Sequence, residues 1–271
     1  MAIIKGYVDT TDGQIHYRKS TEGSGAPIVF FHMTASSSAC YENLMRAIEG
    51  KHPLIAIDSP HYGQSFWPTV EPSIAYMSAV IMEALTNMGV NKFHAFGQHT
   101  GCNIAVQMAV SAPERLLSIS LNGNTYIDGN MRQHCMDTLV YDNPITPHGG
   151  HLITAWTRVI KDVESIPVPA KFAHQEVIDT LLAGEDWHWG YCAVFSHDMI
   201  SIWPKVQCPI FLNCGISDVA YPSHCATKNV APNARVHEAE GHGCYYIATG
   251  AADLGPPLLQ FIDDVVAGKA A

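Results

Sequence analysis

The feature that most constrains this chain is a strand, a tight turn and a helix packed into residues 93–111. An apolar run ends at Gly97, and a helical pattern begins near Thr100, with its apolar residues on one face. Glycine at positions 97 and 101 allows a turn so tight that a β-carbon there would collide with neighbouring backbone. The pattern therefore predicts that His99, between the two glycines, stands at a sharp strand-to-helix turn.

Short strands and helices alternate around this turn. Because continuous apolar runs are typical of strands buried on both faces, the alternation predicts a mostly parallel sheet with helices on both sides. A hairpin is expected at the N-terminus, around the turn signal Asp12-Gly13. The other expected elements are strands at 27–32, 53–58, 92–96 and 116–121 and helices at 73–88 and 100–111.

The strand rhythm stops after residue 124 and returns at 209–214 and 234–239, before a last helix at 251–266. The interval contains helical patterns and is rich in Trp, His and Met. We therefore predict one α/β core with an inserted helical cap, the core formed by 1–124 and 206–271 and the cap by 125–205.

Composition and charge narrow the class of protein. A hydrophobic fraction of 47% with 15% charged residues indicates a compact globular chain. A formal net charge of −10 argues against nucleic acid or an anionic membrane as partner. No apolar run has membrane-spanning length, and the N-terminus lacks a signal-peptide core, so a cytoplasmic location is expected. Eight scattered cysteines, without Cys-x-x-Cys pairs, are expected to be reduced thiols.

Polar residues follow the predicted strands where functional groups collect in such sheets. His32 ends one strand, His99 follows the next turn, Asp218 follows the strand at 209–214, and His242 follows the last strand. A residue at the turn, an acid and a histidine thus appear in the chain order of a catalytic triad.

With these segments the chain resembles the α/β-hydrolase superfamily over essentially its whole length. The resemblance implies that superfamily's fold, with a capped, mostly parallel sheet. Its turn Gly97-Gln98-His99-Thr100-Gly101 resembles the nucleophile elbow, with His where Ser, Cys or Asp is usual. The other matching segments are Phe31-His32-Met33-Thr34, which resembles the oxyanion loop with Met33 in place of Gly, Asp58-Ser59-Pro60-His61-Tyr62-Gly63-Gln64-Ser65, the acid loop Gly215-Ile216-Ser217-Asp218 and the histidine loop Gly241-His242-Gly243.

The resemblance implies a role for each of these positions. His242 would be the base, and Asp218 the carboxylate that fixes its tautomer and stabilises its imidazolium form. The oxyanion hole would be made by the amide of Thr100 and that of Thr34 or Met33.

His99 leaves the mechanism open. A neutral imidazole, whose usual pKa is about 6.5, could attack an acyl carbon directly or could activate a water together with His242. Its size favours the second role. His99, His242 and Asp218 are also suitable metal ligands, but a His242–Asp218 hydrogen bond would compete with coordination. We therefore predict neither a metal nor a cofactor.

Aromatic and polar residues could bind a substrate beneath the cap. His32, Trp156, Trp187 and His188 are the candidates, and they would suit a small apolar or aromatic ligand. Packing of the cap against the core would explain the same residues.

The sequence predicts a hydrolase of a small ester, lactone or related acyl or C–C substrate, using a His-His-Asp site. The alternatives are a lyase or cofactor-free dioxygenase that uses a His242–Asp218 dyad, and a non-catalytic ligand-binding relative. The expected partner is a small molecule, with neither nucleic acid nor membrane, and a homodimer is compatible with the sequence.

Overall fold

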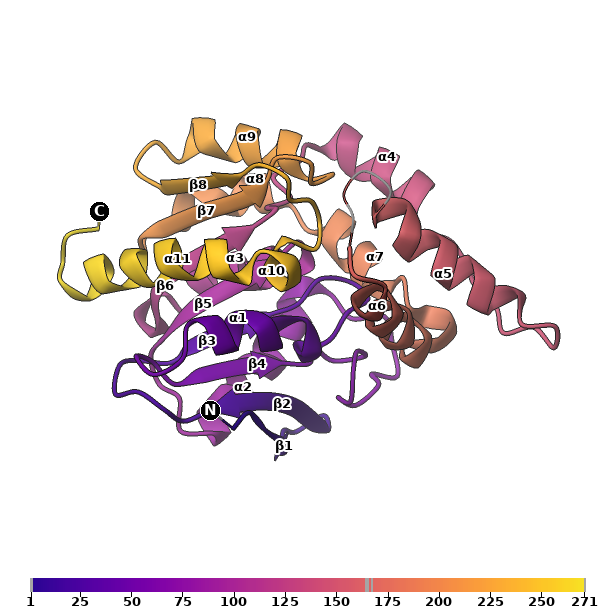
Figure 1. Cartoon of the computed structure of the whole chain (residues 1–271), viewed down its shortest axis with the longest axis horizontal. Helices are drawn as coiled ribbons and strands as arrows, with labels where there is room; N and C mark the ends of the chain where they lie inside the picture. The colour runs from indigo at the N-terminus through magenta and orange to yellow at the C-terminus, as the bar shows by residue number, and fades with distance from the viewer. Residues whose placement is uncertain (1, 164–165, 167, 271) are drawn as a thin grey trace.

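The computed structural model of the protein describes residues 2–163, 166 and 168–270. It contains an eight-stranded sheet in the order β1-β2-β4-β3-β5-β6-β7-β8 (Figure 1). The strands are β1 Ile4–Asp9, β2 Gln14–Ser20, β3 Ile28–Phe31, β4 Leu54–Ile57, β5 Phe93–Gln98, β6 Leu116–Asn122, β7 Ile210–Gly215 and β8 Arg235–Ala239.

The pairing of the strands confirms the predicted sheet. Strands β1 and β2 form the expected antiparallel hairpin, and β2 also runs antiparallel to β4. All neighbours from β4 to β8 are parallel. Every residue of β3, β4 and β5 is buried, because helices cover both faces of the sheet there.

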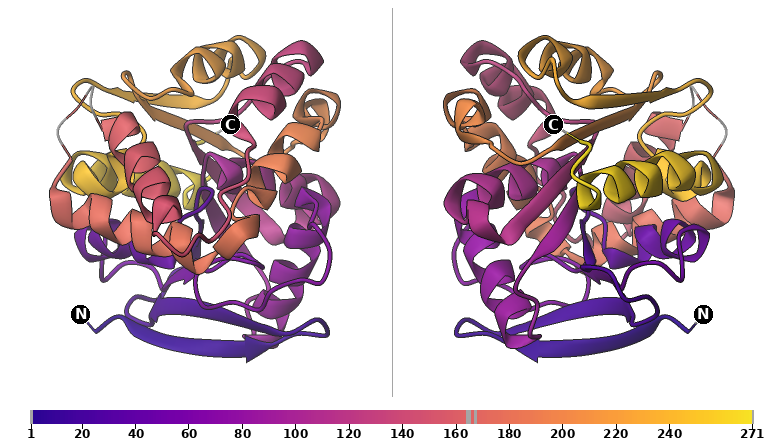
Figure 2. Two further views of the ribbon diagram at one scale, coloured as in Figure 1. Left: turned by 90° about the vertical axis from the view of Figure 1, so that its right-hand side faces the viewer. Right: turned by 90° about the vertical axis from the view of Figure 1, so that its left-hand side faces the viewer.

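Two helical layers enclose the sheet, as the two views in Figure 2 show. One apolar cluster packs helices α2 and α3 against one face, and another packs α1, α10 and α11 against the other. The predicted helix at 73–88 has Ser73 as its N-cap, with the Ser73 side chain accepting a hydrogen bond from the Tyr76 amide. These helices are α1 Glu42–Ala47, α2 Ile74–Asn87, α3 Thr100–Ser111, α10 Tyr246–Thr249 and α11 Ala251–Val266, with α9 Tyr221–Val230 between β7 and β8.

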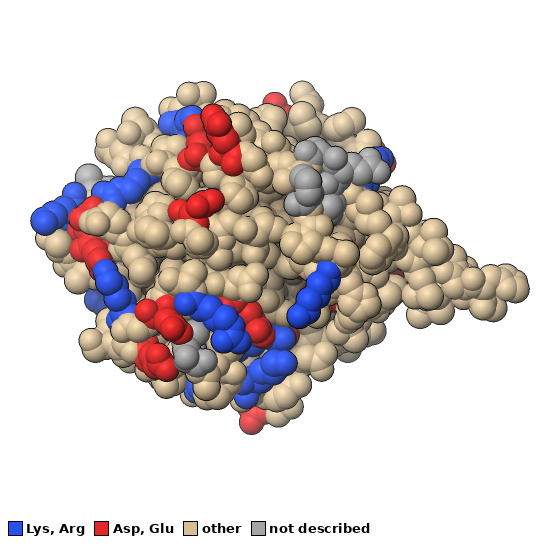
Figure 3. Space-filling view, viewed as in Figure 1, with Lys and Arg blue, Asp and Glu red and all other residues tan. Residues whose placement is uncertain are grey.

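The segment predicted as the cap contains helices and, among its described residues, no strand. Its helices α4, α5, α6 and α7 lie to the right of the sheet in Figure 1. A separate apolar cluster joins helices α5 and α6 to Met33 and Tyr245 of the core loops. In Figure 3 the projecting end of this segment shows no charged side chain on the visible face. Its helices are α4 Gly129–Leu139, α5 Gly150–Val163, α6 Ala170–Leu182, α7 Trp189–Ser196 and α8 Met199–Ile202.

Two further expectations concern the membrane and the cysteines. Among the described helices, none combines the length and the apolar character needed to cross a bilayer. None of the eight cysteines, all of which lie in the described part of the chain, forms a disulfide, and five of them are buried.

Candidate active site

The turn after β5 has the predicted elbow geometry. His99 has φ 46° and ψ −104°, a backbone conformation that non-glycine residues rarely adopt. The close approaches explain the flanking glycines. A β-carbon on Gly97 would lie 2.2 Å from the Gly101 carbonyl oxygen, and one on Gly101 would lie 1.9 Å from that of Phe31. The strained turn therefore holds His99 at the carboxyl end of the central strand.

His99 and Asp218 form the chemical centre of the site. His99 Nε2 lies 2.9 Å from Asp218 Oδ2, while Asp218 Oδ1 accepts a 2.8 Å hydrogen bond from the Ala220 amide. The Asp218 side chain is inaccessible to solvent, and 17% of the His99 side chain is exposed. Burial opposes ionisation of Asp218, but His99, the Ala220 amide and the Cys244 thiol together outweigh burial, so the pKa of Asp218 is lowered. The carboxylate is therefore suited to orient the His99 ring.

The predicted hydrogen bond between His242 and Asp218 is replaced by this one. His242 Nε2 instead lies 3.2 Å from Asp253 Oδ2 of α11, and its ring packs 4.6 Å from that of Tyr246. The physical reason is the length of the side chain at the elbow. An imidazole there extends as far as the Asp218 carboxylate, whereas the shorter side chain of a serine would not, and the carboxylate could then bond to the loop histidine. The elbow residue thus takes the contact that the resemblance assigned to His242.

The predicted oxyanion hole contains a side chain that the sequence prediction did not include. Thr100 Oγ1 accepts a 3.2 Å hydrogen bond from the Thr34 amide and lies 2.8 Å from Thr34 Oγ1. The Thr34 amide is therefore already satisfied within the protein. The Met33 and Thr100 amides stay predictions as oxyanion donors.

Two of the four predicted substrate-binding residues belong to the core instead. His32 is 1% exposed, its Nδ1 donates to the Met33 carbonyl, and its Nε2 accepts from the Ser59 amide. Trp187 is also 1% exposed, with the Arg158 guanidinium 4.7 Å above its ring. Both side chains are used in packing. Trp156 is 37% exposed and His188 is half-buried, so their predicted role is still open.

Gly123 is a site residue that the sequence analysis missed. It follows β6, has φ +61°, and a β-carbon there would lie 2.5 Å from His99 Nε2 and 3.1 Å from Asp218 Oδ2. The signal was the Asn122-Gly123-Asn124 end of the strand beside the elbow. Only glycine leaves room for the His99–Asp218 contact.

Two buried carboxyl groups at the junction with α6 were also missed. Ser36 Oγ donates to Glu176, and Ser37 Oγ donates to Asp179, at 3.0 and 2.9 Å. Burial raises the pKa of Glu176 to about 8, with Asp179 adding to the effect. Burial likewise raises the pKa of Asp179 to about 6. Nothing in the helical spacing of this segment distinguishes buried carboxyl groups from exposed ones.

Among the described residues, the group best placed to hold a metal differs from the set His99, His242 and Asp218 that the sequence analysis weighed. Donor atoms of His99, Asp218 and Cys244 lie within 4.8 Å of one another, and the Cys244 thiol donates to Asp218 Oδ1 at 3.6 Å. His242, which the sequence suggested as a ligand, bonds to Asp253 instead. The hydrogen bond between His99 and Asp218 uses the atoms that coordination would need.

Comparison with known proteins supports the same fold. No protein-family model matches the chain. Haloalkane dehalogenase 2 of Mycobacterium tuberculosis is 29% identical over 121 residues, which cover 44% of this chain and 41% of that enzyme. Bromoperoxidase from Bacillus anthracis superposes with a TM-score of 0.79 at 17% identity, over 96% of this chain and 100% of that one. E-2-(acetamidomethylene)succinate hydrolase gives 0.75 at 18% identity, over 97% and 100%.

These likenesses and the parallel sheet with its elbow show that the chain has the α/β-hydrolase fold. The chain spans less than half the length of the first curated relatives that it matches.

Proposed function

We propose that the protein is an enzyme that hydrolyses a small molecule, with His99 as general base and Asp218 as the carboxylate that orients it. The observation that carries this proposal is the 2.9 Å contact between His99 Nε2 and Asp218 Oδ2 at the elbow. Similarity to a dehalogenase and a hydrolase supports hydrolytic chemistry. The expected substrate class is still a small ester, lactone or related acyl or C–C compound.

The contact determines how the imidazole would act. When Nε2–H donates to the carboxylate, the lone pair lies on Nδ1, and Nδ1 is then the basic atom. It would remove a proton from water as the water attacks the substrate, and Asp218 would stabilise the resulting imidazolium. A positioned base of this kind accelerates a reaction by about 10²–10⁴-fold. Because Asp218 anchors the ring, we favour water activation over a covalent acyl-imidazole.

A non-hydrolytic reaction is the second candidate, and the oxyanion loop favours it. The Thr34 amide, which would stabilise an acyl oxyanion, is bonded to Thr100 Oγ1. A lyase or cofactor-free dioxygenase that begins with proton abstraction needs the base but not that amide. The dyad in this reaction would be His99–Asp218 rather than the predicted His242–Asp218.

Turnover of a panel of small esters and lactones tests the proposal. We expect His99→Ala and Asp218→Asn to lose most of the activity, and His242→Ala, as the matched histidine control, to keep most of it. If His99→Ser were much more active than the parent, His99 would block an ancestral serine site. If no variant turned over any ester or lactone, the search would move to oxygen uptake and carbon–carbon cleavage.

Four further predictions from the sequence, which do not concern the catalytic residues, remain proposals. These are a cap formed by 125–205, a cytoplasmic location, a small-molecule partner without nucleic acid or membrane, and assembly as a homodimer.

A further inference from the structure

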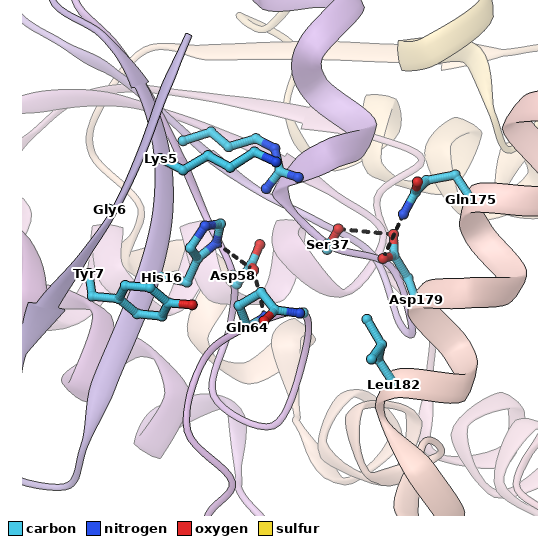
Figure 4. A pocket seen from close by; sticks show the side chains of 12 residues that line it. Lys5, Gly6, Tyr7, His16, Ser37, Asp58, Gln64, Gln175, Asp179 and Leu182 are labelled. Carbon is cyan, nitrogen blue, oxygen red and sulfur yellow. Dashed lines mark hydrogen bonds and ion pairs between the residues drawn. The ribbon is translucent and has the colours of Figure 1, made fainter.

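A polar cleft separates the β1–β2 hairpin from helix α6 (Figure 4). Its volume is about 430 Å³, which lies within the range of small-molecule sites. Lys5 and Arg18 line the side formed by the hairpin, and Asp179 lines the side formed by α6. His99 and Asp218 are not among its lining residues, so the cleft is separate from the candidate active site.

At the floor of the cleft, Asp58 is hydrogen-bonded by groups of the protein itself. Asp58 accepts hydrogen bonds from His16 Nδ1, the Ser38 amide and the Gln64 amide, at 2.8, 2.7 and 2.9 Å. Burial opposes its ionisation, but the bond from His16 and the other donors outweigh burial and lower the pKa of Asp58 to about 2. Asp58 therefore remains a carboxylate whose charge is already compensated by these donors.

The hairpin side carries an excess of positive charge. Lys5 and Arg18 are cross-strand partners in the antiparallel register. Like charges placed opposite each other destabilise a sheet. Arg18 is compensated by Glu42 Oε1 at 3.0 Å, whereas Lys5 takes part in none of the ion pairs found among the described residues. An anion in the cleft would relieve this repulsion.

The α6 side carries the opposite charge. The Asp179 carboxylate accepts hydrogen bonds from Ser37 Oγ and Gln175 Nε2, at 2.9 and 3.1 Å, and both donors are neutral. Asp179 is 3% exposed and forms none of the ion pairs found among the described residues, and Arg18 in the same cleft offsets part of its charge. Because a buried carboxylate without a cation in direct contact is unfavourable, a cation is the complementary group here.

We propose that this cleft binds a small zwitterion, with its carboxylate against Lys5 and Arg18 and its ammonium group against Asp179. An aminocarboxylate of amino-acid type has this chemistry. Such a ligand would bridge the hairpin and the predicted cap. The proposal is independent of the reaction at His99.

Isothermal titration with zwitterions of increasing length tests the proposal on the full chain. The probes are glycine, 4-aminobutanoate and 6-aminohexanoate, with acetate and methylammonium as single-charge controls. We expect one zwitterion to bind more tightly than either control. Lys5→Gln and Asp179→Asn should each weaken that binding by about tenfold or more, since hydrogen bonds to charged groups contribute this much.

Lys19→Gln is the matched control, because Lys19 lies on the same hairpin but contacts the Tyr17 ring, 5.0 Å away. It should leave binding unchanged. Lys5 is exposed on a strand, so Lys5→Gln should fold even if Asp179→Asn does not. The proposal is overturned if no zwitterion binds at millimolar concentration, if acetate binds equally well, or if Lys5→Gln binds like the parent.

Discussion

Replacing the buried Glu176 by glutamine should stabilise the protein at neutral and alkaline pH. Burial, reinforced by Asp179, raises the pKa of this carboxyl from 4.5 to about 8. The folded chain therefore holds a proton that the unfolded chain releases at a lower pH. The contribution of the protonated Glu176 carboxyl to folding stability is complete below pH 4.5 and is lost as the pH rises through about 8.

The size of the effect follows from the difference between the pKa of Glu176 in the folded chain and its pKa in the unfolded chain. Because one pH unit corresponds to about 1.4 kcal/mol, the loss of folding free energy has an upper value of about 3 kcal/mol at pH 7 and about 5 kcal/mol above pH 8. Glutamine keeps the acceptor for Ser36 Oγ but does not ionise. An unpartnered amide proton would cost about 1 kcal/mol. We therefore expect Glu176→Gln to gain about 2 kcal/mol at pH 7 and about 4 kcal/mol at pH 9.

Urea unfolding of the parent and the variant at pH 5, 7 and 9 measures this gain. Glu22→Gln is the control, because Glu22 is exposed, and it should change stability by less than about 0.5 kcal/mol. The reasoning is refuted if the Glu176→Gln and parent stabilities differ by the same amount at all three pH values.

Two other substitutions test the geometry of the site. Gly123→Ala should abolish the His99–Asp218 contact and reduce kcat/KM by about 10²-fold or more, because its β-carbon would lie 2.5 Å from His99 Nε2. Gly89→Ala is the control, because Gly89 has φ +77° and open space around it, so that alanine there bears the same backbone strain without a collision. Equal losses of kcat/KM in the two variants would exclude a specific role for Gly123. Thr100→Val should lower the free energy of unfolding by about 1–3 kcal/mol, because it leaves the buried Thr34 amide without its acceptor. Thr154→Val, at an exposed position of α5, is the comparison, and a Thr100→Val variant as stable as the parent would contradict this assignment.

Local patterns were sufficient to predict much of the fold. The helices expected at 100–111 and 251–266 have these bounds in the structure, and the buried strands β3 and β4 match the continuous apolar runs. Helical and strand periods are properties of neighbouring residues, and the alternation of strands and helices along the chain predicted the parallel sheet.

Side-chain partners could not be predicted in the same way. The motif spacing put Asp218 near two histidines, but the direction of the His99 ring at a strained turn decides which one it contacts. The Thr34–Thr100 bond joins residues 66 positions apart, and the Glu176–Ser36 bond joins residues 140 apart. Such contacts depend on the packing of whole elements against each other.

The most direct test of the central claim is the tautomer of His99, measured by long-range ¹H–¹⁵N NMR of the imidazole rings. His99→Ala identifies its signals, and Asp218→Asn removes the charge of the partner. We predict a neutral His99 ring protonated at Nε2, with this preference weakened in Asp218→Asn. The assignment of His99 as the base would be contradicted if its ring were protonated at Nδ1 and its signals did not change in Asp218→Asn, while the signals of His242 did change in that variant.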